Sequence, residues 1–398
     1  MVFALGVLIL GSMALSIILT AVARSAGRRL GLLDTPGAKG HHKPEVRAVP
    51  NTGGIAVFWS IAIPMLAGLA AAHLGAERTA GGESGGLIAR LPSKILEHLP
   101  GIRSQTPMAL ALLGCMLAVH LIGVVDDRKA LKALPKLGVI LGAGAVLALF
   151  FDVRLLEFLG AEFGTAGAAA SVALTVLWFG AVTNAMNFID NMDGLCAGVA
   201  ATAATFFLVT AVTNEPPQWF VAMALCLLLG SAAGFLMFNF PRRGGATIFM
   251  GDSGSLVIGF LLAFLTVRTT YYAPAEHGDA GAVGAGGWHA VFMPLCVLAV
   301  PLYDLASVTA IRLSQGKSPF VGDQQHFSHR LRARGLSVRQ TLAVITGCTA
   351  ITGISGIALA GLEGWRAALA GAQVLLTLGI LGLYEHASSG RPKEAQGT

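Results

Sequence analysis

Acidic residues lie in or against the ends of hydrophobic segments at four places in this chain: Asp126 with Asp127, Asp190 with Asp193, Asp252, and Asp304. A basic stretch, residues 326–330 (H-F-S-H-R), follows them. An ionised side chain at membrane depth costs several kcal/mol, so such residues persist mainly where they do chemistry or line a wet cavity. Carboxylates gathered near basic groups suggest a divalent cation and a phosphorylated substrate. We therefore expect a membrane enzyme.

The adjacent pair Asp126-Asp127 ends the third hydrophobic segment, in the stretch G-V-V-D-D-R. Two carboxylates at a helix C-terminus face an unfavourable dipole, so an ion or a nearby cation should hold them. The alternative is a solvated helix end that Arg128 and Lys129 neutralise. A lone pair of acids does not decide between these two interpretations.

A polar series recurs at every third residue near the end of the fifth segment, at Asn184, Asn187, Asp190 and Asp193. If this stretch is helical, successive members drift by roughly 60° and form one polar stripe. Amide and carboxylate side chains on one wall can bind a sugar, a nucleotide or a hydrated metal. Hydrogen bonding between helices would explain the asparagines but explains two aspartates poorly, which favours a functional site.

Asp252 opens the eighth segment, within G-D-S-G-S over residues 251–255. A helix N-terminus with glycines, free N–H groups and hydroxyls suits anionic oxygen, and the carboxylate can hold Mg²⁺ there. The alternative is that Asp252 only caps the helix. The stretch is not a G-x-S-x-G nucleophile elbow, because residue 255 is serine.

The loop over residues 316–334 concentrates positive charge and includes His326, His329 and Arg330. Arginine forks match phosphate oxygens, so this loop could neutralise a diphosphate. Charge that only sets the membrane topology would explain the arginines but not the paired histidines. The loop after the first segment, with Lys39 and His42, is similar in composition. Asp304 either faces the cavity or pairs with Arg312.

The composition is that of a membrane protein, so transmembrane helices must position these residues. Apolar residues make up 55% of the 398, charged residues only 12%, and the mean hydropathy is +0.71; a soluble domain carries about 25% charged residues. A transmembrane helix needs about 20 apolar residues. We expect an all-α polytopic protein of about eleven transmembrane helices, or ten if the weakest segment does not span, at roughly 2–23, 52–74, 106–125, 137–151, 166–188, 195–213, 218–238, 247–267, 288–311, 341–361 and 366–384.

The connections between these segments are short, which predicts one membrane-embedded domain over residues 1–386 and a disordered cytoplasmic tail over 387–398. Segment 2–23 has no basic residue before its apolar run, so a retained span is favoured over a cleaved signal. Most of the 27 lysines and arginines fall in one alternate set of loops, which also holds the motifs. The positive-inside rule puts that set in the cytoplasm, with the N-terminus outside. Anionic lipid explains the basic loops without nucleic acid.

Taken in order, the motifs resemble the polyprenyl-phosphate N-acetylhexosamine-1-phosphate transferase family, of the glycosyltransferase 4 type. The resemblance covers about residues 30–340. The DD motif matches residues 126–127, an N-x-x-N-x-x-D-G-x-D-G motif matches 184–194, and G-D-x-G-S matches 251–255. A D-x-P…K…H…P…G-G pattern matches Asp34, Pro36, Lys39, His42, Pro50, Gly53 and Gly54.

Two residues depart from the family pattern. Asn191 stands where the asparagine motif has glycine after its first aspartate. Ser328 stands where the branch that uses UDP-GlcNAc often has the middle histidine of H-x-H-H. The triple-histidine pattern of the MurNAc-pentapeptide branch is absent, and K-S-P-F followed by H-F-S-H is closer to the GlcNAc-type branch.

The resemblance implies a Mg²⁺-dependent enzyme, with Mn²⁺ as the alternative ion. A polyprenyl phosphate, such as undecaprenyl phosphate, attacks the β-phosphate of a UDP-N-acetylhexosamine and releases UMP. Asp252 would be the main metal ligand, with Asp190 and Asp193 in the nucleotide and metal region. Asp127, with Asp126, would orient or deprotonate the lipid phosphate. Phe249 would stack on uracil, and the diphosphate or sugar would be held by His326, His329 and Arg330.

The leading hypothesis is therefore a UDP-GlcNAc-type sugar-1-phosphate transferase that starts a lipid-linked cell-envelope glycan in the bacterial inner membrane, with its active site at the cytoplasmic face. The alternative within this class is the phospho-MurNAc-pentapeptide transferase of peptidoglycan synthesis. A multispan transporter, from a different class, would place charges near the bilayer midplane and often has internal repeats. The expected partners are the nucleotide sugar, the polyprenyl phosphate and the bilayer, and a homodimer is left open.

Overall fold

The computed structural model describes residues 2–34, 48–80, 99–242, 244–271, 291–319, 325–359, 362 and 364–387. Within these residues the secondary structure is helical apart from two isolated β-bridges, which pair Leu33 with Pro50 and Asn51 with Phe249. Ten of the described helices are long and apolar enough to cross a membrane. The prediction of an all-α polytopic membrane protein is confirmed.

The ten long helices are α1 (Val2–Arg29), α2 (Gly53–Ala80), α5 (Thr106–Arg128), α6 (Ala133–Phe150), α7 (Phe158–Ile189), α8 (Leu195–Thr213), α9 (Trp219–Asn239), α10 (Asp252–Tyr271), α14 (Val338–Ala358) and α15 (Gly364–Ala387). The shorter helices are α4 (Leu99–Ser104), α11 (Met293–Val297), α12 (Ala299–Ser314) and α13 (Phe327–Ala333).

The segment expected as one helix over 288–311 is instead broken into α11 and α12. Pro301 explains the position of the break. Its ring nitrogen cannot donate to the carbonyl of Val297, four residues earlier, and the ring clashes with that carbonyl. Helix α11 accordingly ends at Val297, and Leu298 joins the two pieces. This is why ten rather than eleven single helices reach spanning length among the described residues.

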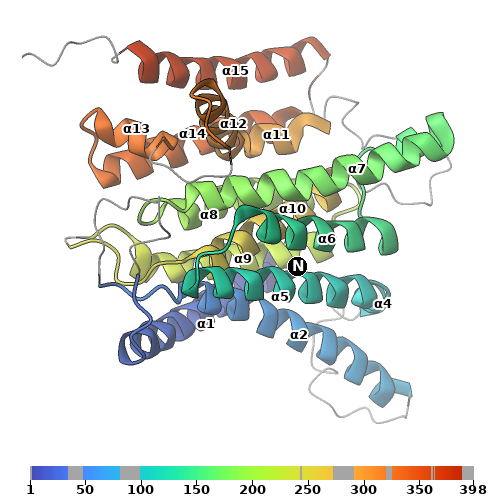
Figure 1. Cartoon of the computed structure of the whole chain (residues 1–398). Helices are drawn as coiled ribbons and strands as arrows, with labels where there is room; N and C mark the ends of the chain where they lie inside the picture. Colours follow the sequence, from blue (N-terminus) through green and yellow to red (C-terminus); the bar gives the residue numbers. More distant parts are fainter. Residues whose placement is uncertain are drawn as a thin grey trace, which may run out of the picture.

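Helix α10 lies at the centre of the bundle, where it packs against α2, α5, α7, α8 and α9. In the most apolar part of α10, 89% of the residues are buried inside the protein, whereas the corresponding share in α15 is 11%. Figure 1 shows the long helices side by side, with α15 (red) at one edge and α1 and α2 (blue) at the other. The first turn of α10 carries Asp252, so the most enclosed of the long helices begins at a candidate site residue.

Glycines bring the starts of α2 and α10 into backbone contact. The N–H groups of Gly53 and Gly54 donate to the carbonyls of Phe249 and Met250, each at 2.9 Å. A Cβ atom on Gly54 would lie 2.3 Å from the backbone nitrogen of Gly254. Close approach of backbones through small residues is a common way to pack helices in lipid. The ends of these two helices therefore meet at a fixed separation.

The described parts of the loops that the sequence assigned to the charge-rich side lie together at one end of the bundle. Contacts between them join Asn51 to Asp127, Asp193 to Ala246, Asn191 to Ser328, and Arg339 to Pro241. The prediction that these loops share one side is therefore confirmed. That this side faces the cytoplasm remains a prediction.

We expect Gly54→Ala to destabilise the protein by about 1–3 kcal/mol, the usual cost of forcing extra volume into a packed site. Gly68→Ala is the matched control, because it lies on the same helix and no atom stands within 4 Å of the position that its Cβ would take. The measurement is the thermal unfolding midpoint of the detergent-solubilised protein. Equal midpoints for the two variants would contradict the close approach of α2 and α10.

Candidate active site

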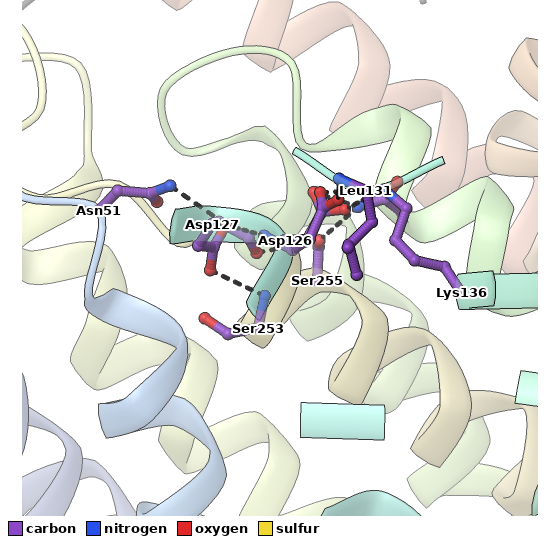
Figure 2. A network of polar contacts seen from close by, with 10 residues as sticks. Asn51, Asp126, Asp127, Leu131, Lys136, Ser253 and Ser255 are labelled. Carbon is purple, nitrogen blue, oxygen red and sulfur yellow. Dashed lines mark hydrogen bonds and ion pairs between the residues drawn. The ribbon is translucent and has the colours of Figure 1, made fainter. Parts of the chain in front are cut away.

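Asp127, at the C-terminal end of α5, caps the N-terminus of α10 (Figure 2). One carboxylate oxygen accepts the N–H of Asp252 at 2.8 Å, and the other accepts the N–H of Ser253 at 3.1 Å. The side-chain amide of Asn51 also donates to this carboxylate at 3.1 Å. The first N–H groups of a helix have no partner within it, and the helix dipole favours an anion there. Asp127 supplies both the acceptor oxygens and the charge.

Gly251 makes room for this carboxylate. Its φ of +70° is a left-handed conformation that glycine adopts readily. A Cβ atom at this position would lie 2.6 Å from both carboxylate oxygens of Asp127 and 2.5 Å from the amide oxygen of Asn51. Residue 251 must therefore be glycine both for its backbone conformation and for the contact that Asp127 makes beside it.

Lys136, in the first turn of α6, bridges two of the predicted carboxylates (Figure 2). Its ammonium lies 3.0 Å from Asp126 and 2.7 Å from Asp252. The same Asp126 side chain accepts the N–H of Leu131 at 2.7 Å, which closes the α5–α6 turn. The motifs had not singled out Lys136. A cation in the first turn of a helix opposes the helix dipole, so Lys136 needs a nearby anion. That need was the one sign in the sequence that Lys136 pairs with an acidic residue.

Asn187 fixes the second oxygen of Asp252. Its amide nitrogen donates to this carboxylate at 2.9 Å and lies 3.0 Å from the hydroxyl of Ser255. Both oxygens of Asp252 are thus held, one by Lys136 and one by Asn187. The structure brings together the DD motif, the asparagine motif and the G-D-x-G-S motif, which lie far apart in the sequence.

The expectation of one helical polar stripe from 184 to 193 is only half correct. Helix α7 ends at Ile189, so Asp190 and Asp193 lie in the turn that leads to α8. The turn is completed by Gly194, with φ +78°. Asn184 stays in the helix, where its side-chain amide donates to the carbonyl of Gly180 at 2.8 Å.

The two aspartates of this turn differ in their surroundings. Burial raises the pKa of Asp190 well above its usual value, and the carboxylates of Asp252, Asp127 and Asp193 raise it further. The carboxylate of Asp193 accepts the N–H of Ala246 at 2.8 Å, which ties the turn to the loop before α10. Negative charge therefore accumulates around Asp190, and a cation that bound there would be stabilised.

The histidines of the basic loop lie beside the end of α7. His326 contacts the ring of Phe188 edge to face, with ring centres 5.1 Å apart, and its Nδ1 lies 2.9 Å from the carboxylate of Asp304. The ring of His329 is 6.4 Å from that of His326. Burial, together with His326, lowers the pKa of His329. Phe188 precedes Asp190 by two residues, so this loop faces the same turn.

Arg330 is held by groups of the chain itself. Its guanidinium donates to Glu385 of α15 and to Ser307 of α12, each at 2.8 Å, and also to the carbonyl of Gln325. Its expected role with the diphosphate stays a prediction. Phe249 is partly buried and anchored through its backbone at the bridge to Asn51, and its role in uracil stacking also stays a prediction.

The two positions that depart from the family pattern contact each other. The hydroxyl of Ser328 donates a hydrogen bond to the side-chain oxygen of Asn191. Ser328 is buried on α13, and Asn191 lies in the turn between Asp190 and Asp193. The bond therefore links the helix of the basic loop to the acidic turn. The expected substrate residues Lys39 and His42 lie outside the described residues.

The donor set is of the kind that Mg²⁺ binds. Among the described residues, no three His, Cys, Asp or Glu side chains are grouped as metal ligands. Mg²⁺ is usually held by one or two carboxylates together with water and substrate phosphates. Asp252 and Asp126 both present carboxylate oxygens toward one cationic group, the ammonium of Lys136. These two residues fit a magnesium ion in the type of their ligand atoms.

Comparison with known proteins identifies the family. The chain is 30% identical over 343 residues to the decaprenyl-phosphate N-acetylglucosaminephosphotransferase of Mycobacterium tuberculosis, with 82% of this chain and 75% of that protein covered. The sequence profile of glycosyl transferase family 4 matches residues 109–270. The chain belongs to glycosyl transferase family 4. The matched residues 109–270 contain Asp126, Asp127, Lys136, Asn187 and Asp252.

Two further relatives of this family 4 glycosyl transferase align over most of their length. The probable undecaprenyl-phosphate N-acetylglucosaminyl 1-phosphate transferase of Bacillus subtilis is 28% identical over 353 residues, which cover 88% of this chain and 83% of the relative. The undecaprenyl-phosphate alpha-N-acetylglucosaminyl 1-phosphate transferase of Escherichia coli K12 is 24% identical over 343 residues, with 84% and 78% covered.

We expect substitutions at the Asn191–Ser328 contact to be coupled. Ser328→His should lower the thermal unfolding midpoint, because the imidazole would need the space that the Asn191 side chain fills. Asn191→Gly removes that side chain, so the double variant should recover part of the loss. A coupling free energy of about 0.5–3 kcal/mol is typical of contacting residues. Ser328→Ala, which removes the bond without adding volume, is the control. Strictly additive effects would show that the two positions do not compete for space.

Proposed function

We propose that this chain transfers N-acetylglucosamine 1-phosphate from UDP-N-acetylglucosamine to a polyprenyl phosphate, releases UMP, and thereby begins a lipid-linked cell-envelope glycan. The names of the relatives support this donor and this class of acceptor. The observation that carries the proposal is the convergence of Asp126, Asp127 and Asp252 with Lys136 at one end of the bundle. Clustered carboxylates beside fixed cationic groups suit a diphosphate bound with a metal ion.

Asp127 acts as a positioning residue in this proposal. Both of its oxygens accept backbone N–H groups of α10, so its carboxylate holds Asp252 at the start of that helix. This role differs from the two that the resemblance implies, in which Asp127 orients or deprotonates the lipid phosphate. Deprotonation by Asp127 is not required by the acceptor, because a phosphate monoester is largely ionised at neutral pH and needs no dedicated base.

We propose Asp252 as the main ligand of Mg²⁺, with Asp126 beside it and Asp193 at the turn after α7. When bound, the ion neutralises phosphate charge as it is redistributed during transfer. Phosphoryl transfer depends chiefly on positioning and on electrostatic stabilisation. Asn187 orients the Asp252 carboxylate, and Lys136 neutralises the carboxylate pair when no substrate is bound.

The proposed location is the inner membrane of a bacterium, with the site at the cytoplasmic face and the N-terminus outside. The support is the excess of lysine and arginine in the loops that share the site's end of the bundle. A nucleotide sugar is a cytosolic metabolite, and the phosphate of a polyprenyl phosphate sits at the leaflet surface. A site at that face can reach both substrates.

The test is UMP release by the purified full chain with undecaprenyl phosphate, Mg²⁺ and a panel of UDP-sugars. UDP-GlcNAc should support turnover, and UDP-MurNAc-pentapeptide should not. Asp252→Asn should lower the rate by about 10²-fold or more, because the charge that meets the ion and the diphosphate is lost. Asp152→Asn is the control, since that carboxylate is exposed and lies between α6 and α7 at the other end of the bundle.

Three results would contradict parts of the proposal. No UMP from UDP-GlcNAc would reject the donor, and turnover with UDP-MurNAc-pentapeptide in its place would favour the alternative branch. Near-normal turnover by Asp252→Asn at every Mg²⁺ concentration would remove Asp252 from the metal role. Removal of divalent ions with a chelator should stop turnover, and added Mg²⁺ should restore it.

A further inference from the structure

Asp304 is a fully buried carboxylate on α12, with no exposed surface. Both of its oxygens form hydrogen bonds at the start of α13, one with His326, just before the helix, and one with Phe327, its first residue. One lies 2.9 Å from Nδ1 of His326, and the other accepts the N–H of Phe327 at 2.6 Å. A buried carboxylate without partners would cost several kcal/mol. The two hydrogen bonds account for its presence here and fix where the basic loop begins.

The pairing with Asp304 selects one tautomer of His326. An ionised carboxylate only accepts hydrogen bonds, so Nδ1 must carry the proton that is donated. The hydrogen bond at one ring nitrogen decides what the other nitrogen can do. Nε2 is then the ring nitrogen left for a substrate. Because His326 is only 8% exposed, the ring has little freedom to choose another orientation.

The ring of His326 lies beside the end of the helix that leads into the acidic turn of residues 190–193. Its edge-to-face contact is with Phe188, near the end of α7 and two residues before Asp190. The guanidinium of the buried Arg312 lies over the same phenyl ring, 5.4 Å from its centre. The ring of His329 is 6.4 Å from that of His326, measured between ring centres. The aromatic ring of Phe188 on α7 and the titratable groups of Arg312 on α12 and His329 on α13 thus lie close to the Asp304–His326 pair.

We propose that Asp304 is a positioning residue of the transferase reaction, which acts through His326. It holds the imidazole with Nδ1 protonated and turns Nε2 toward the phosphorylated donor bound at the acidic turn. This inference rests on the proposed function. The competing explanation is that Asp304 only pins the start of α13, through the N–H of Phe327.

A double-mutant cycle in the full chain separates these two explanations. The variants are Asp304→Asn, His326→Asn and their combination, each assayed for UMP release. His326→Asn keeps a side-chain N–H near the position of Nδ1 but has no counterpart of Nε2. Each single variant should lower kcat about 10- to 100-fold, the usual effect of losing an orienting partner, while KM for polyprenyl phosphate stays unchanged. The double variant should be no slower than His326→Asn.

Ser307→Ala is the matched control. Ser307 lies on the same helix as Asp304 and also contacts α13, through Arg330; its hydroxyl donates to the backbone carbonyl of Asp304 and not to the carboxylate that holds His326. Its kcat should remain near that of the unmodified protein. A decrease equal to that of Asp304→Asn would show that any loosening of α12 from α13 is sufficient, and the positioning role would be rejected.

The tautomer can be measured without any substitution at Asp304, which matters if Asp304→Asn does not fold. Nitrogen-15 NMR of ¹⁵N-histidine-labelled protein, with the His326 signals assigned by their loss in His326→Asn, should show a proton on Nδ1. A neutral ring protonated only at Nε2 would overturn the proposal. So would normal kcat in His326→Asn, or fully multiplicative losses in the double variant.

Failure of the proposed function would give a different pattern from failure of this inference. If the unmodified chain releases no UMP from any UDP-sugar, the proposed function is wrong, while the NMR measurement still tests the pairing. If the unmodified chain is active and Asp304→Asn is equally active, only the positioning role is wrong.

Discussion

The whole site depends on one electrostatic contact between two helix ends. The C-terminus of α5 presents Asp127, and the N-terminus of α10 presents the N–H groups of Asp252 and Ser253, at 2.8 and 3.1 Å. Each end alone would be unfavourable, because an acid at a helix C-terminus opposes the dipole and a buried N-terminus leaves N–H groups without partners. When the two ends meet, the carboxylate gains hydrogen-bond donors and the N–H groups gain an acceptor. This contact also sets the position of Asp252, since the central helix of the protein begins at that residue.

Packing and charge then reinforce this contact. Gly54, Gly123 and Gly251 let the backbones and the Asp127 carboxylate approach within distances that any side chain would prevent. Lys136 and Asn187 each hold one oxygen of Asp252, so its carboxylate is oriented before a substrate arrives. Such preorganisation is what stabilisation of a developing charge requires, because no groups need to reorient during the reaction. The basic loop places His326 beside the end of α7, next to the turn that carries Asp190 and Asp193.

The sequence predicted the helical membrane fold and most of the converging motifs, because hydropathy and ligand chemistry are local properties. The sequence-based prediction was wrong or incomplete where the position of a residue depends on a local backbone break or on a partner far away in the chain. Gly194 and the end of α7 place Asp190 and Asp193 in a turn rather than on a helical stripe, and Pro301 divides the expected ninth span. Lys136 has no motif of its own, and its importance appears only when Asp252, 116 residues later, is placed beside it.

The most direct test of this account is hydrogen exchange at the first turn of α10. In the unmodified chain the amides of Asp252 and Ser253 should be protected by Asp127. In Asp127→Ala they should exchange at least about tenfold faster, since hydrogen bonds to a charged acceptor contribute about 1.5–3 kcal/mol each, while amides in the middle of α10 should be unchanged. Equal protection of the first turn in both proteins would contradict the claim that Asp127 holds the start of α10 and thereby positions Asp252.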